Sequence, residues 1–280
     1  MLYPPVNVFL RKSRRSLLKY FPYSLWSRFA IDRSCGVGRY AEFGPHEKFA
    51  NIGAGTHFYH PRWSCFDCYG RSFESPKYGY TNLDLCRTKI PGKYRLIYSS
   101  HVVEHIPEDR LSFFLENIVE SLVPGGCVRF VYPCARSAYE ALQRDDLSYF
   151  EIYSSKVAIN IPRVDKIVYL FLDLMISECR ELTFNHDFRK HFERLRTRSS
   201  MVELLDYCKD YPLKLKTANL KGFDHVNWFT HEKLGTELQR YGLQPHISAF
   251  GQSRYSPMRE VPLFDGWLPC ISSYTEAIKA

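Results

Sequence analysis

Short runs of apolar residues, separated by loops, dominate the chain between residues 48 and 134. Such runs are typical of buried strands, because a sheet covered on both faces needs apolar side chains on both sides. They predict strands at residues 48–52, 64–69, 80–85, 95–100 and 127–132. Strands joined in this way favour a mostly parallel sheet with helices on its faces.

In two segments outside these runs, apolar residues recur with the spacing of an α-helix. Between the fourth and fifth strands, apolar residues recur three and four positions apart and predict a helix: Leu111, Phe114, Leu115, Ile118 and Leu122. The Pro-Gly-Gly sequence at 124–126 is expected to stop it. Residues 230–241 predict a second helix stopped by Gly242, and residues 245–250 and 273–279 predict two closing strands.

Three zones follow from this pattern. Residues 46–134 and 223–280 carry the alternation of strands and helices and are predicted to form one α/β domain. Residues 135–222 break that alternation with helical, aromatic and basic sequence. We therefore predict a helical insertion that caps the domain and contacts its substrate. Residues 1–45 form a separate basic, aromatic N-terminal arm.

The N-terminal arm has no acidic residue before Asp32, and its bases are interleaved with large apolar side chains. Residues 8–29 are therefore suited to peripheral contact with an anionic membrane surface or with a phosphate-rich partner. The alternative is an arm that packs its apolar side on the domain and leaves its charges in water. The longest nearly apolar stretch, residues 167–177, is too short to cross a bilayer.

The composition is that of a folded globular protein. The chain has 280 residues, of which 45% are apolar and 24% charged, and this excludes disordered and collagen-like classes. Its nine cysteines are scattered, which favours a cytoplasmic location, with the inner membrane surface as a peripheral site. Cys65 and Cys68 lie in a predicted strand and point to opposite faces. No second pair follows them, so the sequence predicts no metal site.

The residues at the carboxyl ends of the strands are the first place to look for a site, because ligands of open parallel sheets bind there. The first strand ends in Gly53-Ala54-Gly55. Two glycines with one residue between them allow a sharp turn and a close approach of the backbone to a ligand. A dinucleotide fingerprint would need a third glycine where the chain has Phe58, which argues against a pyrophosphate site.

Acidic residues end the second and third strands. Asp67 follows Gly55 by twelve residues, and its carboxylate can accept hydrogen bonds from both hydroxyls of a ribose. Asp84 lies where an adenine amino group could be bound. For Asp84 a helix-capping role remains an equal alternative.

The fourth strand leads into a group of polar side chains. Ser100 and His101 end it, and Glu104 and His105 follow after two valines. Ionisable groups packed beside a buried strand end are typical of functional sites. His105 is the first candidate for a proton acceptor and His101 the second, because histidine is the side chain most easily tuned near neutral pH.

The order of these motifs resembles that of the class I S-adenosylmethionine-dependent methyltransferases. The resemblance covers residues 48–133 and, more loosely, 227–279; the segment 273–279 is similar to the final strand of small stand-alone bacterial members. It implies a Rossmann-like seven-stranded sheet, mostly parallel with the last strand antiparallel. It also implies S-adenosylmethionine as the cofactor, held by the residues at the strand ends: Asn51, Gly53, Ala54, Gly55, Asp67, Asp84, Ser100 and His101.

Two positions depart from the family pattern. Asn51 stands where the family usually has an acidic residue, and His57 where it often has a glycine. The side-chain carbonyl of Asn51 can still accept a hydrogen bond from the methionine ammonium, but without the charge. These departures keep open a catalytically silent interaction module with the same fold.

The loop after the fourth strand also bears on the methyl acceptor. Members that methylate planar amines often carry an Asn/Asp-Pro-Pro-aromatic loop there, whereas residues 99–102 read Ser-Ser-His-Val. The sequence therefore favours O-methylation of a small-molecule or glycan hydroxyl or carboxyl. His225, Asp224 and His231 are further candidates for the chemistry.

The net charge of +8 keeps another alternative open. Basic residues are concentrated at 11–19 and 189–198, which would suit a nucleic-acid-binding protein or an RNA methyltransferase that uses the basic arm.

Overall fold

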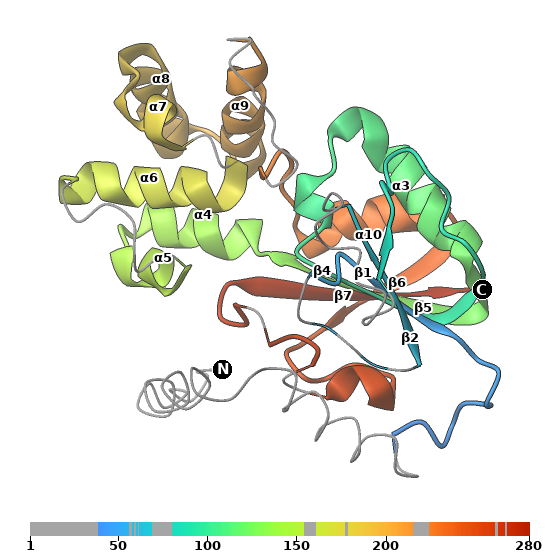
Figure 1. Ribbon diagram of the computed structural model, residues 1–280. Coiled ribbons are helices and arrows are strands. Elements are labelled where there is room, and N and C mark those ends of the chain that lie inside the picture. The colour runs from blue at the N-terminus through green and yellow to red at the C-terminus, as the bar shows by residue number, and fades with distance from the viewer. Residues whose placement is uncertain are drawn as a thin grey trace.

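A computed structural model of the chain is shown in Figure 1. It describes residues 39–55, 58, 60, 62–68, 80–153, 161–176, 179–214, 224–260, 263–266 and 268–280. Most of the N-terminal arm, including the predicted membrane-contact segment 8–29, lies outside the described residues. At the described end of that arm, Tyr40 and Phe43 are buried in the apolar cluster on one face of the sheet.

One sheet of seven strands forms the centre of the described structure. Its strands are β1 Phe49–Ile52, β2 Trp63–Asp67, β3 Tyr80–Asn82, β4 Tyr94–Ser100, β5 Leu122–Pro133, β6 Leu243–Ser248 and β7 Ser272–Lys279. They lie in the order β3-β2-β1-β4-β5-β7-β6. Strands β1 to β5 pair in parallel, and β7 pairs antiparallel with both β5 and β6. The predicted fold class, a mostly parallel sheet with a reversed last strand, is confirmed.

The two faces of the sheet alternate along each strand. Ala50, Ile97 and Val128 belong to the apolar cluster that includes α3 (Glu108–Ser121) and α10 (His231–Arg240). Their neighbours, such as Phe49 and Leu96, belong to the cluster on the opposite face. In Figure 1, α3 and α10 lie together on one side of the sheet. The sheet therefore has a core on both faces, as the unbroken apolar runs predict.

The structure corrects two predicted boundaries. Strand β5 begins at Leu122, so the Pro-Gly-Gly sequence at 124–126 lies inside an irregular strand rather than after a helix. A Cβ atom on Gly126 would lie 2.8 Å from the carbonyl oxygen of Val123, which explains the need for glycine. Strand β3 ends at Asn82 because Asp84 accepts a hydrogen bond from the backbone of Cys86 and starts a turn.

Six helices lie between β5 and α10 along the described chain. They are α4 Ala135–Gln143, α5 Leu147–Tyr153, α6 Arg163–Ile176, α7 Cys179–Phe184, α8 His186–Arg198 and α9 Met201–Lys214. They share a separate apolar cluster, which Trp228 and Ile271 join from outside the group. Helix α4 follows β5 directly, so the group projects from the carboxyl edge of the sheet (Figure 1). Among the helices that the structure describes, none has the length and apolar character required to span a bilayer.

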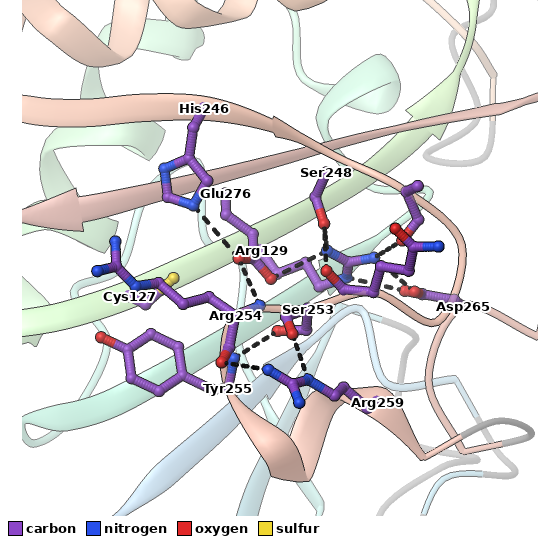
Figure 2. Close-up of polar contacts among 12 residues, drawn as sticks. Cys127, Arg129, His246, Ser248, Ser253, Arg254, Tyr255, Arg259, Asp265 and Glu276 are labelled. Atoms are coloured by element: carbon purple, nitrogen blue, oxygen red, sulfur yellow. Dashed lines mark hydrogen bonds and ion pairs between the residues drawn. The ribbon is translucent and has the colours of Figure 1, made fainter.

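A buried charge cluster joins β5, β7 and the segment before β7 (Figure 2). Arg129 is fully buried, and its Nε and one terminal nitrogen donate to the two carboxylate oxygens of Asp265 at 3.0 and 2.5 Å. The remaining N–H groups donate to Ser248 Oγ, Glu276 Oε1 and the carbonyl of Ala249. All five N–H groups of the guanidinium are therefore hydrogen-bonded. We call this group the Arg129 cluster.

Candidate functional site

The turn after β1 has the backbone geometry of a ligand-binding loop. Gly53 and Gly55 have φ values of +68° and +59°, a region that glycine adopts without strain. A Cβ atom on Gly53 would lie 2.1 Å from Cγ2 of Val102, so this turn packs tightly against the segment after β4. A Cβ atom on Gly55 would meet no described atom within 4 Å. The Gly55 side of the turn is therefore open.

Asp67 connects β2 to the glycine turn. Its Oδ2 accepts a hydrogen bond from the backbone N–H of Gly55, and its Oδ1 accepts one from Cys68, both at 2.8 Å. The residue is only 9% exposed. The role of Asp67 in holding the glycine turn was not predicted from the sequence. A carboxylate can accept about four hydrogen bonds, so contact with a ribose remains compatible with it and stays a prediction.

The other predicted cofactor residues lie at the same edge of the sheet but differ in setting. Asn51 is buried in β1, and Ala54 is buried within the glycine turn. Asp84 is about half exposed and accepts a hydrogen bond from Cys86 N in the turn after β3; no described helix begins there, so this is not the helix cap considered from the sequence. Its contact with adenine stays a prediction, and His57 lies outside the described residues.

The end of β4 carries a strained histidine. Ser100 is the last residue of β4, and His101 has φ +53°, an unusual value for a residue with a side chain. Ser272 Oγ donates to the carbonyl of Leu268 and therefore accepts from His101 Nε2 at 3.0 Å. The other ring nitrogen, Nδ1, lies 3.0 Å from Glu104 Oε1. Strained backbone held by its surroundings is often found at functional sites.

Glu104 lies in η2 (Val103–His105) and is 2% exposed. Neither of its carboxylate oxygens accepts a hydrogen bond of good geometry, although Oε1 is close to His101. Burial raises the pKa of Glu104, but the contact with His101 and the nearby histidine charges outweigh burial and bring the pKa below its usual value. Glu104 is thus held as a buried carboxylate among histidines.

His105 and His225 stand beside this carboxylate. Their rings are perpendicular with centroids 4.7 Å apart. His105 Nδ1 lies 3.0 Å from the carbonyl oxygen of Asp224, and His225 Nδ1 lies 2.6 Å from that of Leu174. The pKa of His225 is lowered, first of all by burial. Each ring is therefore oriented by a backbone carbonyl.

The segment that carries His225 is fixed to η2 by its backbone. The carbonyl oxygen of Glu104 accepts hydrogen bonds from Val226 N at 2.9 Å and from Asn227 N at 3.1 Å. This contact joins positions more than 100 residues apart in the sequence. It explains why His225 and Asp224, both considered from the sequence, lie at His105.

Two other predicted features lie elsewhere or have intramolecular partners. His231 Nδ1 lies 3.0 Å from Thr275 Oγ1 on β7 and does not join the histidines after β4. In the basic segment of α8, Arg189 pairs with Asp165 and Glu193, and Arg196 with Asp145. Because Arg189 and Arg196 form ion pairs within the chain, they give less support to a nucleic-acid-binding surface on α8 than the sequence suggests.

Comparison with known proteins finds likeness in structure but not in sequence. No protein-family model and no curated protein matches the chain. Among solved structures, it is similar to a complex of DhpI with SAM and HEP, at 13% identity and a TM-score of 0.42, covering 96% of this chain and 92% of that one. It is also similar to the N-methyltransferase NodS from Bradyrhizobium japonicum, at 11% identity and a TM-score of 0.38, covering 94% and 99%. A third is an S-adenosylmethionine-dependent methyltransferase from Mesorhizobium loti, at 15% identity and a TM-score of 0.40, covering 85% and 94%.

At these identities the likeness concerns the fold alone. The strand order and the reversed β7 are those that the resemblance in the sequence implies. By its strand order and its reversed β7, the chain has the fold that the resemblance to class I S-adenosylmethionine-dependent methyltransferases implies.

Proposed function

We propose that this protein is an S-adenosylmethionine-dependent methyltransferase that methylates an oxygen of a small-molecule or glycan acceptor. The observation that carries the proposal is the meeting of the glycine turn and the end of β4. Strands β1 and β4 are neighbours, while β2 and β3 continue on the other side of β1. The chain direction across the sheet thus reverses between β1 and β4, where open α/β sheets bind ligands.

The residues present fit the cofactor. The open side of Gly55 leaves room for a ligand against the backbone, and Asp67, held beside it, offers a carboxylate for ribose hydroxyls. We assign the buried Asn51, near the end of β1, to the methionine part of the cofactor. When bound, S-adenosylmethionine supplies a methyl group activated by a sulfonium.

The acceptor side is formed by the segment after β4 and the helices that follow β5. Holding the acceptor oxygen in line with the methyl group and away from water supplies several kcal/mol, by the general magnitude of orientation effects. His101, Glu104 and His105 are ionisable groups on the segment after β4, and Val102 of the same segment packs against Gly53. We propose that helices α4–α9 cover the acceptor.

The test uses a pair of glycine variants, Gly55→Ala and Gly242→Ala. Both glycines have positive φ, +59° and +75°, and neither has an atom within 4 Å of an added Cβ. Each substitution should cost about 1–2 kcal/mol of stability through the same backbone strain. Calorimetric titration with S-adenosylhomocysteine should show affinity at least ~10-fold weaker for Gly55→Ala, equivalent to about 1.4 kcal/mol.

The control, Gly242→Ala, should bind the ligand as the unmodified protein does, because Gly242 follows α10 away from the turn. Equal affinities for the two variants would remove the glycine turn from the cofactor site. If the unmodified protein binds neither S-adenosylmethionine nor its demethylated product, the interaction-module alternative replaces this proposal.

A further inference from the structure

Glu104, His105 and His225 form a cluster of metal-ligand type that the sequence did not predict. One ring nitrogen of each histidine and one carboxylate oxygen lie within 4.8 Å of one another. With metal–ligand bonds of about 2.0–2.2 Å, the ligand atoms of a tetrahedral cation lie roughly 3.3–3.6 Å apart, so these atoms would have to move together by about 1–1.5 Å to hold one cation. The cluster combines residues from η2 and from the segment before α10.

The hydrogen bonds of the two histidines determine which nitrogen is available as a ligand. A carbonyl oxygen only accepts, so His105 Nδ1 and His225 Nδ1 both donate a proton to their carbonyl partners. In the neutral ring, Nε2 then keeps its lone pair. A ligand histidine whose other nitrogen donates to a backbone carbonyl is the usual arrangement around a protein-bound metal.

Glu104 provides the second, independent observation. Its side chain is almost fully buried, and neither carboxylate oxygen accepts a hydrogen bond of good geometry. Its one close polar contact is with His101, 3.0 Å from Oε1, and a buried carboxylate with so few contacts is costly unless an ion or water completes them. A cation between Glu104 and the ring nitrogens of His105 and His225 would complete them.

We propose that Glu104, His105 and His225 bind one divalent first-row transition-metal cation. Two imidazoles and a carboxylate suit cations such as Zn²⁺, Co²⁺ and Fe²⁺, and three protein ligands leave coordination positions open. His101 is a positioning residue in this arrangement, since it orients Glu104 from 3.0 Å and is itself held by Ser272. His105 is partly exposed, so we expect solvent and the acceptor to reach the cation from the side of His105.

The position of this cluster gives the cation a role that rests on the proposed function. A cation bound to a hydroxyl of the acceptor stabilises the deprotonated oxygen and releases the proton to water. The new O–C bond then forms as the C–S bond breaks, and the bonding electron pair stays on sulfur. In this arrangement His105 is a metal ligand. This role replaces that of proton acceptor, which the sequence suggests for His105.

The test measures metal binding without turnover. The full-length protein is freed of metal by dialysis against a chelator and titrated with Co²⁺, and the visible and near-ultraviolet spectra are recorded. We expect one Co²⁺ per chain, with visible bands of nitrogen and oxygen ligands and no strong thiolate band. The absence of the thiolate band distinguishes this site from the exposed cysteines Cys68 and Cys270.

Ligand variants locate the cation. Glu104→Gln, His105→Gln and His225→Gln should each weaken Co²⁺ binding at least ~10-fold, since even residues behind the ligands have effects of about 10–100-fold. The matched controls are Glu116→Gln and His186→Gln, both exposed, and they should bind Co²⁺ normally. If a buried variant does not fold, His105→Gln decides, because His105 is partly exposed.

No Co²⁺ binding, a thiolate spectrum, or unchanged affinity in His105→Gln would overturn the inference. Titration with S-adenosylhomocysteine separates this failure from failure of the proposed function. A protein that binds the nucleoside but no Co²⁺ refutes only the metal site. A protein that binds Co²⁺ through these residues but not the nucleoside refutes only the methyltransferase proposal.

Discussion

The Arg129 cluster and the cluster of Glu104, His105 and His225, here called the Glu104 cluster, both bury charge but differ in how that charge is hydrogen-bonded. Every N–H group of Arg129 has an acceptor, and its carboxylate partners receive further hydrogen bonds: Asp265 from Gly251 and Glu276 from Arg254. Glu104 has three histidines around it and no well-formed hydrogen bond to either oxygen. A satisfied buried network holds a fold together, whereas an unsatisfied one is retained where a ligand completes it.

The two clusters also differ in position. Figure 2 shows the Arg129 cluster among β5, β6, β7 and the segment before β7, a region that contains none of the predicted cofactor residues. Glu104 follows β4 at the carboxyl edge, beside the glycine turn. The difference teaches that hydrogen bonding, and not burial of charge, distinguishes the Arg129 cluster from the cluster that we propose binds a cation.

Removing the centre of the Arg129 cluster should have the largest effect. Arg129→Met leaves Asp265 and Glu276 buried without their cation, and loss of one partner of a buried pair costs about 3–5 kcal/mol. Arg136→Met, which breaks an exposed pair with Glu232, should cost less than about 1 kcal/mol. Urea unfolding of both variants measures the difference. Equal costs would show that the cluster contributes no special stability.

The next largest effect concerns His60, a buried histidine that, like Arg129, has a partner within the chain. Its Nδ1 accepts a hydrogen bond from Arg62 N at 3.2 Å, and burial, together with the Arg62 charge, lowers its pKa from 6.5 to about 4. Between these values the unfolded chain binds a proton that the folded protein does not. Stability should therefore fall as pH drops from about 6.5 to 4, by up to about 3 kcal/mol.

Replacing His60 with Gln keeps an acceptor but removes the titration. We expect the free energy of unfolding of His60→Gln to depend less on pH over this window than that of the unmodified protein. Denaturant unfolding at pH 7 and pH 4.5 measures this change in slope, and the carboxylates common to both proteins cancel in the comparison. If the unmodified protein and His60→Gln show the same pH dependence of the free energy of unfolding, protonation of His60 does not destabilise the folded protein.

The smallest effect compares the two buried glutamates directly. Glu276→Gln loses charge-assisted hydrogen bonds to Arg129 and to the backbone of Arg254, and should cost about 2–3 kcal/mol. Glu104→Gln loses the charged contact of Oε1 with His101 but no other side-chain hydrogen bond, so in metal-free protein it should cost less than Glu276→Gln, about 1 kcal/mol. Thermal unfolding without added metal tests the pair. A larger loss for Glu104→Gln would mean that its histidines already satisfy the carboxylate.

Much of the fold was predictable from local sequence. The strand positions agree with the structure to within a few residues, except that β3 is shorter and β5 begins earlier than expected. Those two errors arise where hydrogen bonds, and not the apolar pattern, set the strand ends. Asp84 starts a turn after β3, and Leu122 pairs with Tyr94 of β4, so β5 begins before the Pro-Gly-Gly sequence.

The candidate site was predictable in part. Gly53, Gly55, Asp67 and His101 were expected at strand ends, where the structure has them, because strand ends and glycine spacing are local features. Their contact with a cofactor stays a prediction. Asp67 gained a role in holding the turn that no local pattern indicates. Glu104 was noticed beside the histidines, but its lack of hydrogen bonds depends on the side chains that bury it.

By itself the sequence determined where strands, helices and the glycine turn form, since periodicity and backbone preference act over a few neighbouring residues. Only the tertiary structure decided that His225 lies beside Glu104 and His105, and that Arg129 lies beside Asp265. These pairs are more than 100 residues apart, and their contacts arise from packing the segment before α10 against η2 and the segment before β7 against β5. Burial removes water from both clusters, and the hydrogen bonds that replace this water around Arg129 but not around the Glu104 carboxylate give the two clusters their different chemistry.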